Sequence, residues 1–373
     1  MMSDEVRWIS GNRELSEAVS RVGNGPLAID TEADSLHHYQ EKVCLIQLSF
    51  GGQDYLFDPL EGEAPQALGP LLEDPAVPKL LHGADYDLRI LDRDFGFAVR
   101  GVFDTMIAAR LTGERAFGLA ALLDKHIGVT LDKRFQRADW SRRPLSDEMI
   151  RYAVMDTRYL DRLVGLLEEK LRELGRTEWA REEFERLEQV RWKGGKEGEP
   201  FMRVKGARRL RREGLAALRE LWTLRDARAR ERDVPVFKVM RDPVLVELAR
   251  VRPRRRGQLQ EVEGLPRNWL RPSAAEAILA AIEAAAGADL DSLPSFDRKP
   301  RPIRAEGFDG RVKQLMKARD SVAEELDLDP TLLANRETME TIQGRLDDGK
   351  APLELDDLRR WQAELLAPLV RSG

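Results

Sequence analysis

An apolar run that ends in two carboxylates, residues 27–32, restricts the fold of this chain more than any other stretch. The run lies between Pro26 and a polar segment, a pattern typical of a buried strand. Because strand side chains alternate between faces, Asp30 and Glu32 point to the same side, about 7 Å apart. Two ionised carboxylates about 4 Å apart repel each other by roughly 4 kcal/mol at an effective dielectric near 20. The pair therefore indicates either a hydrated strand end or a site that holds a cation or a proton.

Length and composition predict a globular protein of two or three domains. The chain has 373 residues, of which 42% are hydrophobic and 34% are charged. Its single cysteine, Cys44, excludes an internal disulfide and a cysteine-based zinc site. The acidic start has no signal-peptide pattern, and no apolar run reaches the length of about 18 residues typical of a membrane span. We therefore expect a cytoplasmic protein that has no membrane partner.

The charges are distributed unevenly along the chain. Residues 1–200 contain 27 Lys and Arg against 37 Asp and Glu, whereas residues 201–373 contain 34 against 29. The basic excess includes clusters at 203–212 and 250–256. An acidic first half and a basic second half suit a metal-loaded site that acts on a polyanion. Solvated helix faces are the alternative explanation for such clusters.

The first half of the chain has the pattern of an α/β domain with a mixed sheet. Two apolar runs flank Gly51-Gly52, which predicts a hairpin. Further strands and helices alternate after it. The expected strands are 27–32, 43–50, 53–60, 79–82 and 99–103; the expected helices are 64–72, 88–95, 105–111 (capped by Asp104) and one from 147 to beyond 171.

Two further acids follow at informative places. Asp87 lies where a helix follows a strand, so it is either a cap or a site residue, and Asp85 competes for both roles. Tyr152 and Asp156 are four residues apart on the helix from Asp147, so they share a helix face. A surface tyrosine above a solvated aspartate is the alternative for that pair.

Together these motifs resemble the three exonuclease motifs of the DEDD superfamily, tyrosine subclass, in the same order. The motifs are Asp30-x-Glu32, residues 82–87 and Tyr152-x-x-x-Asp156, with support from residues 103–105 and 138–140. Within that superfamily the chain is most similar to the ribonuclease D family, which is similar in turn to the exonuclease subunit of the nuclear exosome. The resemblance implies an α/β ribonuclease H-like exonuclease domain, with a mixed sheet flanked by helices, followed by two all-α HRDC-like helical domains.

The resemblance also implies a reaction and its residues. Four acids would hold two divalent cations, Mg²⁺ or Mn²⁺, and Tyr152 would hold the attacking water. The reaction would hydrolyse 3′-terminal phosphodiesters and release nucleoside 5′-monophosphates. The metal ligands implied are Asp30, Glu32, Asp87 and Asp156, which with Tyr152 form the implied catalytic set.

Three residues near the motifs are weaker candidates for nucleic-acid contacts. Thr31 points away from the face of its neighbouring carboxylates, so that only its backbone suits a terminal nucleotide. For His82, a satisfied structural histidine is the more common role. For Gln47, which lies in the middle of a strand, a solvated or backbone-bonded amide is the more common role.

The second half of the chain has a helical pattern that resembles HRDC domains. We expect the exonuclease domain at 1–192, a linker at 193–206, an HRDC domain at 207–290 and a second HRDC-like domain at 305–373. Ser273 and Glu276 predict a capping box for a helix that ends near Ala285. The helical domains would bind RNA phosphates or only brace the catalytic domain. The arginines expected to contact phosphates are Arg208, Arg209, Arg211, Arg212, Arg254 and Arg255.

We therefore expect a monomeric 3′→5′ exoribonuclease that acts on tRNA precursors or other structured RNA 3′ ends. A DNA 3′→5′ exonuclease is one alternative, because the motifs recognise a phosphodiester and do not reveal the sugar. A non-catalytic RNA-binding scaffold on a nuclease fold is another. The paired acids argue against the scaffold, since such a protein has no need to retain carboxylates that repel each other.

Overall fold

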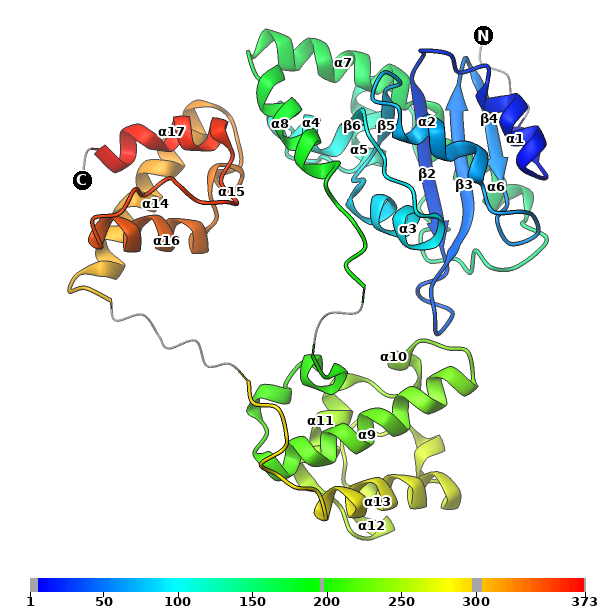
Figure 1. Cartoon of the computed structure of the whole chain (residues 1–373), viewed down its shortest axis with the longest axis vertical. Coiled ribbons are helices and arrows are strands. Elements are labelled where there is room, and N and C mark those ends of the chain that lie inside the picture. Colours follow the sequence, from blue (N-terminus) through cyan, green and yellow to red (C-terminus); the bar gives the residue numbers. More distant parts are fainter. Residues whose placement is uncertain (1–5, 195–197, 297–303, 372–373) are drawn as a thin grey trace. The chain divides into compact units, whose positions relative to one another are not determined.

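A computed structural model describes residues 6–194, 198–296 and 304–371 (Figure 1). These residues form two compact units. The first contains residues 6–32, 43–192 and 304–371, and the second contains residues 33–42 together with the described part of 193–300. The segment 33–42 therefore packs with the second unit although it follows the first acid motif directly.

A six-stranded mixed sheet forms the centre of the first unit, with the strand order β1-β4-β3-β2-β5-β6. Strands β3 and β4 are antiparallel, whereas β1 pairs with β4, β2 with β5, and β5 with β6 in parallel. Gly51 and Gly52 have φ values of 58° and 75°, as a two-residue hairpin turn requires. The predicted mixed sheet is confirmed. Its strands are β1 Val6–Ile9, β2 Leu27–Ala33, β3 Val43–Phe50, β4 Gln53–Phe57, β5 Lys79–Leu81 and β6 Val102–Asp104.

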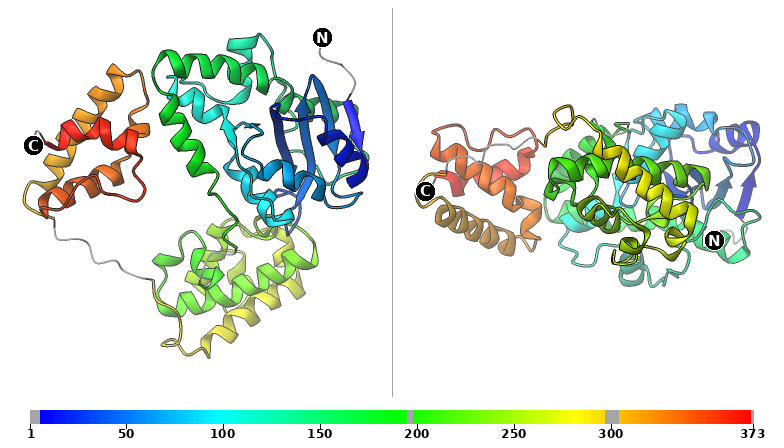
Figure 2. Two further views of the ribbon diagram at one scale, coloured as in Figure 1. Left: turned by 45° about the horizontal axis from the view of Figure 1, so that its top comes forward. Right: turned by 90° about the horizontal axis from the view of Figure 1, so that it is seen from below.

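Helices cover both faces of this sheet (Figures 1 and 2). Helix α6 packs on β3 and β4, α7 packs on β5, and α3 contacts β3. The apolar residues of β2 and β3 are almost completely buried between these layers, so the sheet is the core of the unit. The helices around it are α1 Asn12–Val19, α2 Gly69–Glu73, α3 Asp85–Phe95, α4 Thr105–Leu111, α5 Leu119–Ile127, α6 Asp147–Arg158, α7 Leu160–Glu173 and α8 Thr177–Leu187, with a short 3-10 helix at Gln66–Leu68.

Several predicted boundaries are wrong. The helix expected from Asp147 to beyond Leu171 is two helices, because Tyr159, at φ −108° and ψ 2°, leaves the helical conformation. The apolar pattern continues through this break and therefore does not reveal it. The helix expected at 88–95 begins earlier, at Asp85, so Asp87 lies in its first turn. The predicted Asp104 cap is confirmed, and Gly96 ends α3 in the left-handed conformation at φ 76°.

The C-terminal helices belong to the first unit and share a core with α4, α7 and α8. Trp361 stacks on Trp179 with ring centroids 4.9 Å apart. Arg359 forms a salt bridge of 2.8 Å with Glu183. These helices are α14 Phe308–Glu325, α15 Pro330–Leu333, α16 Arg336–Asp347 and α17 Arg360–Arg371.

The second unit is helical and is built around α9, against which α11 and α13 pack. The segment 33–42 also contacts α9, since the Tyr39 hydroxyl lies 2.9 Å from Asp226. The predicted capping box at Ser273 is wrong, because Pro272 begins the helix and no side chain caps it. The helices are α9 Arg212–Glu231, α10 Val236–Val239, α11 Asp242–Val251, α12 Arg256–Leu259 and α13 Pro272–Ala286, with 3-10 helices at Pro200–Arg203, Ala207–Arg209 and Arg267–Leu270.

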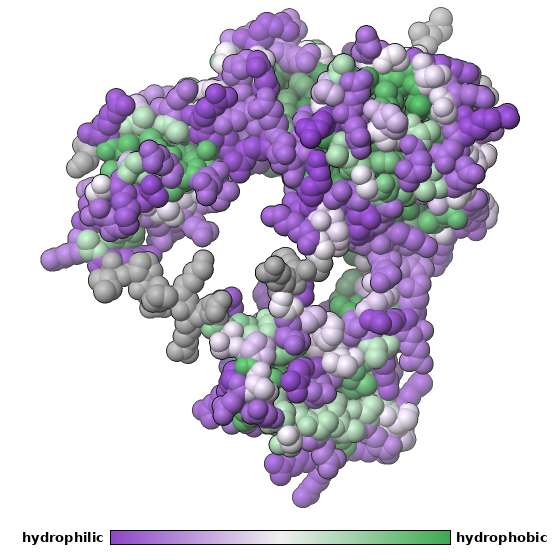
Figure 3. Space-filling view, viewed as in Figure 1, coloured by the Kyte–Doolittle hydropathy of each residue, from purple (hydrophilic) through white to green (hydrophobic). Residues whose placement is uncertain are grey.

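The described helices lack the length and the apolar character that a bilayer crossing requires. The surface visible in Figure 3 is mainly hydrophilic, and hydrophobic side chains show between the charged ones at scattered places.

Candidate active site

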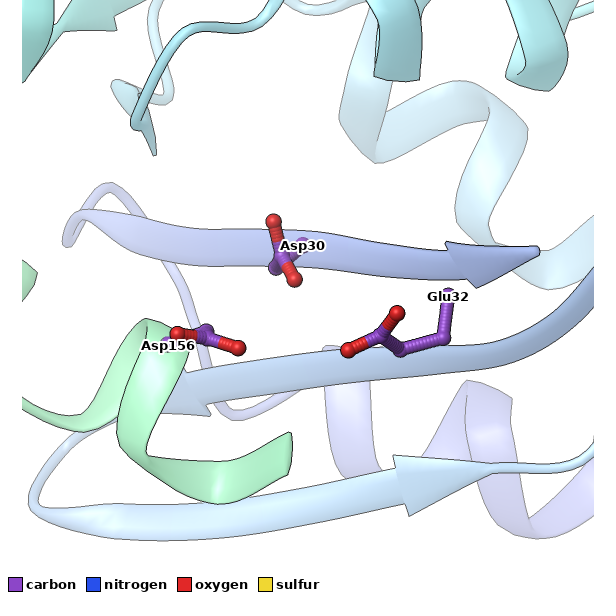
Figure 4. Close-up of side chains that lie close together, drawn as sticks. All are labelled: Asp30, Glu32 and Asp156. Carbon is purple, nitrogen blue, oxygen red and sulfur yellow. The ribbon is translucent and has the colours of Figure 1, made fainter. Parts of the chain in front are cut away.

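Three carboxylates from two elements converge in the first unit (Figure 4). Asp30 and Glu32 project from β2, and Asp156 projects from α6. One carboxylate oxygen of each lies within 4.8 Å of the others. The alternation of β2 places its two acids on one face, and α6 packs on that face of the neighbouring strands. Residues 126 positions apart in the chain therefore meet in one group.

Buried contacts hold α6 in this place. Ser146 caps its first turn by accepting a hydrogen bond from Met149 N. Ala153 and Val154 pack among buried residues of the sheet. These contacts fix the helix face that carries Tyr152 and Asp156.

The three carboxylates line a cavity of about 560 Å³. Tyr152 and His82 form part of its wall, together with the first turn of α5 and the segment around Lys133. Its remaining lining residues are Gly118, Leu119, Ala120, Ala121, Leu131, Asp132 and Gln136. A volume of this size lies within the range of sites for small ligands.

The electrostatics of this cavity disfavour three ionised acids. Burial raises the pKa of Asp30 and Glu32 well above their ordinary values, and the charges of nearby acids raise both further. Burial also raises the pKa of Asp156 to about 7. In the described part of the chain, none of the three carboxylates forms a salt bridge with Lys, Arg or His. A group of oxygen ligands without a protein counter-charge fits a hard divalent cation.

Tyr152 lies one helical turn before Asp156 and lines the same cavity. Its ring packs against Phe135 and Trp140, with centroid distances of 6.0 and 5.9 Å. Burial and the surrounding acids raise the pKa of its hydroxyl above the ordinary value. A hydrogen bond from this hydroxyl lowers the pKa of Asp156 against the effect of burial. Tyr152 is therefore a neutral hydrogen-bonding group at neutral pH.

Asp87 lies outside the group of three. It is buried in the first turn of α3, and its Oδ1 accepts a hydrogen bond from the Thr31 hydroxyl. Its charge nevertheless raises the pKa of Asp30 and Asp156, so it is electrostatically part of the site. Burial raises its own pKa to about 6. Asp85, which the sequence left as a competitor, is instead paired with Arg89 at 2.8 Å on the surface.

A polar network behind Asp156 was not anticipated from the sequence. Asp54 on β4 forms a buried salt bridge of 2.6 Å with Arg158, and it accepts a 2.5 Å hydrogen bond from Ser49 on β3. The Ser49 and Thr157 hydroxyl oxygens lie 2.7 Å apart. Two residues of this network directly follow Asp156. Polar side chains in two otherwise apolar strands were the signal that could have indicated it.

The weaker sequence predictions have mixed outcomes. The prediction of a solvated or backbone-bonded Gln47 is wrong, since this side chain is fully buried and has no hydrogen-bond partner in the described structure. His82 Nδ1 lies 2.9 Å from Thr105 Oγ1, and the ring lines the cavity. Burial lowers the pKa of His82.

The predicted basic contacts lie in the second unit. The Arg208 guanidinium lies over the Phe296 ring, and Arg212 donates a 3.3 Å hydrogen bond to Pro294 O. Arg212 is thus partly engaged within its own unit. The side chains exposed at the surface are those of Arg208, Arg209, Arg211, Arg254 and Arg255.

Comparisons with known proteins agree with this architecture. A family described as 3′-5′ exonuclease matches residues 6–172, and one described as HRDC domain matches residues 214–282. Ribonuclease D of Pseudomonas paraeruginosa is 30% identical, over 99% of this chain and 97% of its own. Ribonuclease D of Xanthomonas oryzae is also 30% identical, over 98% of this chain and 99% of its own.

Solved structures extend the agreement to the fold. The crystal structure of Escherichia coli RNase D, described as an exoribonuclease involved in structured RNA processing, matches with a TM-score of 0.74 and 28% identity. That match covers 99% of this chain and 98% of the other. The catalytic core of RRP6 from Trypanosoma brucei matches with a TM-score of 0.65 and 27% identity, over 78% of this chain and 81% of its own. The chain therefore belongs to the ribonuclease D family of 3′–5′ exoribonucleases.

Proposed function

We propose that this chain removes nucleotides one at a time from the 3′ end of RNA, using two divalent cations. The cations bind in the cavity lined by Asp30, Glu32 and Asp156, here called the acid pocket. Mg²⁺ and Mn²⁺ are the cations that carboxylate oxygens favour. The observation that carries the proposal is the convergence of Asp30, Glu32 and Asp156 in one cavity without a cationic side chain paired to them in the described structure.

The residues of the site have separate roles in this proposal. Asp30, Glu32, Asp87 and Asp156 hold the cations. When bound, divalent cations lower the pKa of a water and neutralise charge on the phosphate oxygens. The neutral Tyr152 hydroxyl, which already bonds Asp156, orients the attacking water rather than removing its proton. Hydrolysis of the last phosphodiester then releases a nucleoside 5′-monophosphate.

A labelled-substrate assay tests this function. RNA and DNA oligonucleotides labelled at the 5′ end are incubated with Mg²⁺, with Mn²⁺ or with a chelator. We expect an RNA ladder that shortens by one nucleotide with either cation and no shortening with the chelator. Degradation of DNA alone would favour the DNA exonuclease, and binding of RNA without shortening would favour the scaffold.

For the natural substrate, we propose structured RNA 3′ ends such as those of tRNA precursors. Support comes from the E. coli relative, which is described as acting in structured RNA processing. A tRNA transcript with a 3′ extension, compared with an unstructured RNA of equal length, measures this preference. Equal rates on both substrates would contradict it.

We also propose that exposed arginines of the second unit bind RNA phosphates. Arg254 and Arg255 are exposed, and their side chains form no salt bridge in the described structure. Replacing both with alanine removes about two phosphate contacts, which reduces the slope of log affinity against log salt by about 1.4. An unchanged slope would favour the alternative that these helices only brace the catalytic domain.

A further inference from the structure

Thr31 and its neighbours face opposite sides of β2. Asp30 and Glu32 point toward Asp156 on α6, whereas the Thr31 hydroxyl is bonded to Asp87 on α3. We infer that Thr31 is a positioning residue that holds Asp87 as a cation ligand. This inference rests on the proposed function, because it assigns Asp87 to the cation site.

The surroundings of Asp87 explain why it needs such a partner. Its side chain is buried, and no Lys, Arg or His forms a salt bridge with it among the described residues. A buried carboxylate without a counter-charge requires hydrogen-bond donors to stay in one orientation. The Thr31 hydroxyl donates to Oδ1 of this carboxylate, and backbone hydrogen bonds from Thr31 and Asp87 add to it; all of them lower the pKa of Asp87 against the effect of burial.

The position of α3 makes this contact effective. Asp87 is in the first turn of the helix, which begins directly after the loop that follows β5. Thr31 lies between two of the clustered carboxylates on β2. A hydrogen bond from this residue therefore ties the α3 end to the strand that carries Asp30 and Glu32. Because threonine is branched at Cβ, its χ1 angle is restricted, which keeps the donor in place.

The test is a titration of the full-length protein with Mn²⁺, in which free Mn²⁺ is measured by electron paramagnetic resonance. Thr31→Val removes the hydroxyl but keeps the shape, and Thr31→Ser retains the donor. We expect Thr31→Val to weaken the weakest Mn²⁺ binding step by about tenfold, as loss of a partner to a metal ligand typically does. Thr31→Ser should stay within about threefold of the wild type.

Thr112→Val is the matched control. Thr112 is also buried, but its hydroxyl donates to the Ala109 carbonyl and is not bonded to a carboxylate. Asp87→Asn completes a double-mutant cycle with Thr31→Val, and we expect Thr31→Val to cause no additional loss in that background. If Thr31→Val does not fold, Thr31→Ala takes its place in each comparison.

Three results would overturn the role of Thr31. The first is that Thr31→Val binds Mn²⁺ with wild-type affinity. The second is that Thr31→Ser loses as much Mn²⁺ affinity as Thr31→Val. The third is that Thr31→Val lowers the Mn²⁺ affinity of the Asp87→Asn variant as much as it lowers that of the wild type. The proposed function fails separately, if the Mn²⁺-loaded wild type does not shorten RNA. In that case the role of Thr31 is still decided by the Mn²⁺ affinities.

Discussion

Two buried carboxylate sites in the first unit, Glu114 and the acid pocket, differ in whether cationic side chains are paired with them. Glu114 is buried and is surrounded by Lys125, His126 and Lys170, at 2.7, 3.2 and 3.2 Å. Burial tends to raise its pKa, but hydrogen bonds from the two lysines outweigh this effect and lower the pKa of Glu114. At this site the counter-charge comes from lysine side chains of the protein itself.

The acid pocket has the opposite balance. Its carboxylates have raised pKa values, and no cationic side chain of the described structure is paired with them. The difference indicates that Glu114 is structural, whereas the acid pocket, which has no paired cationic side chain among the described residues, fits a counter-charge supplied by divalent cations. The following experiments test whether the two sites differ in this way.

The largest expected difference is in activity. Asp30→Asn should reduce nucleotide release from labelled RNA by about 10³-fold, because loss of a metal ligand removes several kcal/mol of transition-state stabilisation. Glu114→Gln is the matched control and should keep activity within about threefold. Similar losses in both variants would mean that the acid pocket has no special role.

The second difference concerns pH and cation binding. Asp87 and Asp156 have folded-state pKa values raised to about 6 and about 7. In the metal-free protein their contribution to stability is therefore present at low pH and is lost as pH rises through these values. Cations reverse this loss, so the increase in unfolding free energy on adding Mn²⁺ should grow from pH 5.5 to pH 8. At about 100 times the dissociation constant it reaches about 2.7 kcal/mol.

The control for this experiment is again Glu114. Its pKa is lowered, so its contribution has the opposite sign and is lost as pH falls. Glu114→Gln should leave the Mn²⁺-dependent gain unchanged at each pH. A gain that is independent of pH in the wild type would contradict the raised pKa values.

The smallest expected difference is in the stability of the metal-free protein. With a chelator present, Asp30→Asn should raise the free energy of unfolding by about 1 kcal/mol at pH 8, because it removes one of several repelling charges. Glu114→Gln should lower it by about 1–2 kcal/mol, because it removes the acceptor of a paired network. Denaturant titration measures both, and changes of the same sign would disprove the contrast.

The sequence was sufficient to predict a mixed sheet with five of its six strands and the convergence of three acids, but it did not predict the edge strand β1. Alternation along residues 27–33 and the spacing of Tyr152 and Asp156 are local patterns, and each fixes which side chains share a face. The DEDD resemblance then supplied the order of the motifs, and the family is confirmed by its relatives. Tyr152 and Asp156 line the same cavity, as the helical spacing predicted.

What the sequence could not predict depends on tertiary packing. The hydrogen bond from Thr31 to Asp87 joins the first motif to the second, and no spacing rule indicates such a contact. Gln47 is fully buried without a hydrogen-bond partner in the described structure, whereas the sequence predicted an amide that is solvated or bonded to the backbone. The break at Tyr159 is hidden because its neighbours continue the apolar pattern.

The central claim is that the acid pocket receives its counter-charge from bound divalent cations. Crystals grown with Mn²⁺, with diffraction measured at the manganese absorption edge, test it most directly. We predict anomalous density coordinated by Asp30, Glu32 and Asp156. A pocket without anomalous density, in crystals of a protein that degrades RNA with Mn²⁺, would contradict the account.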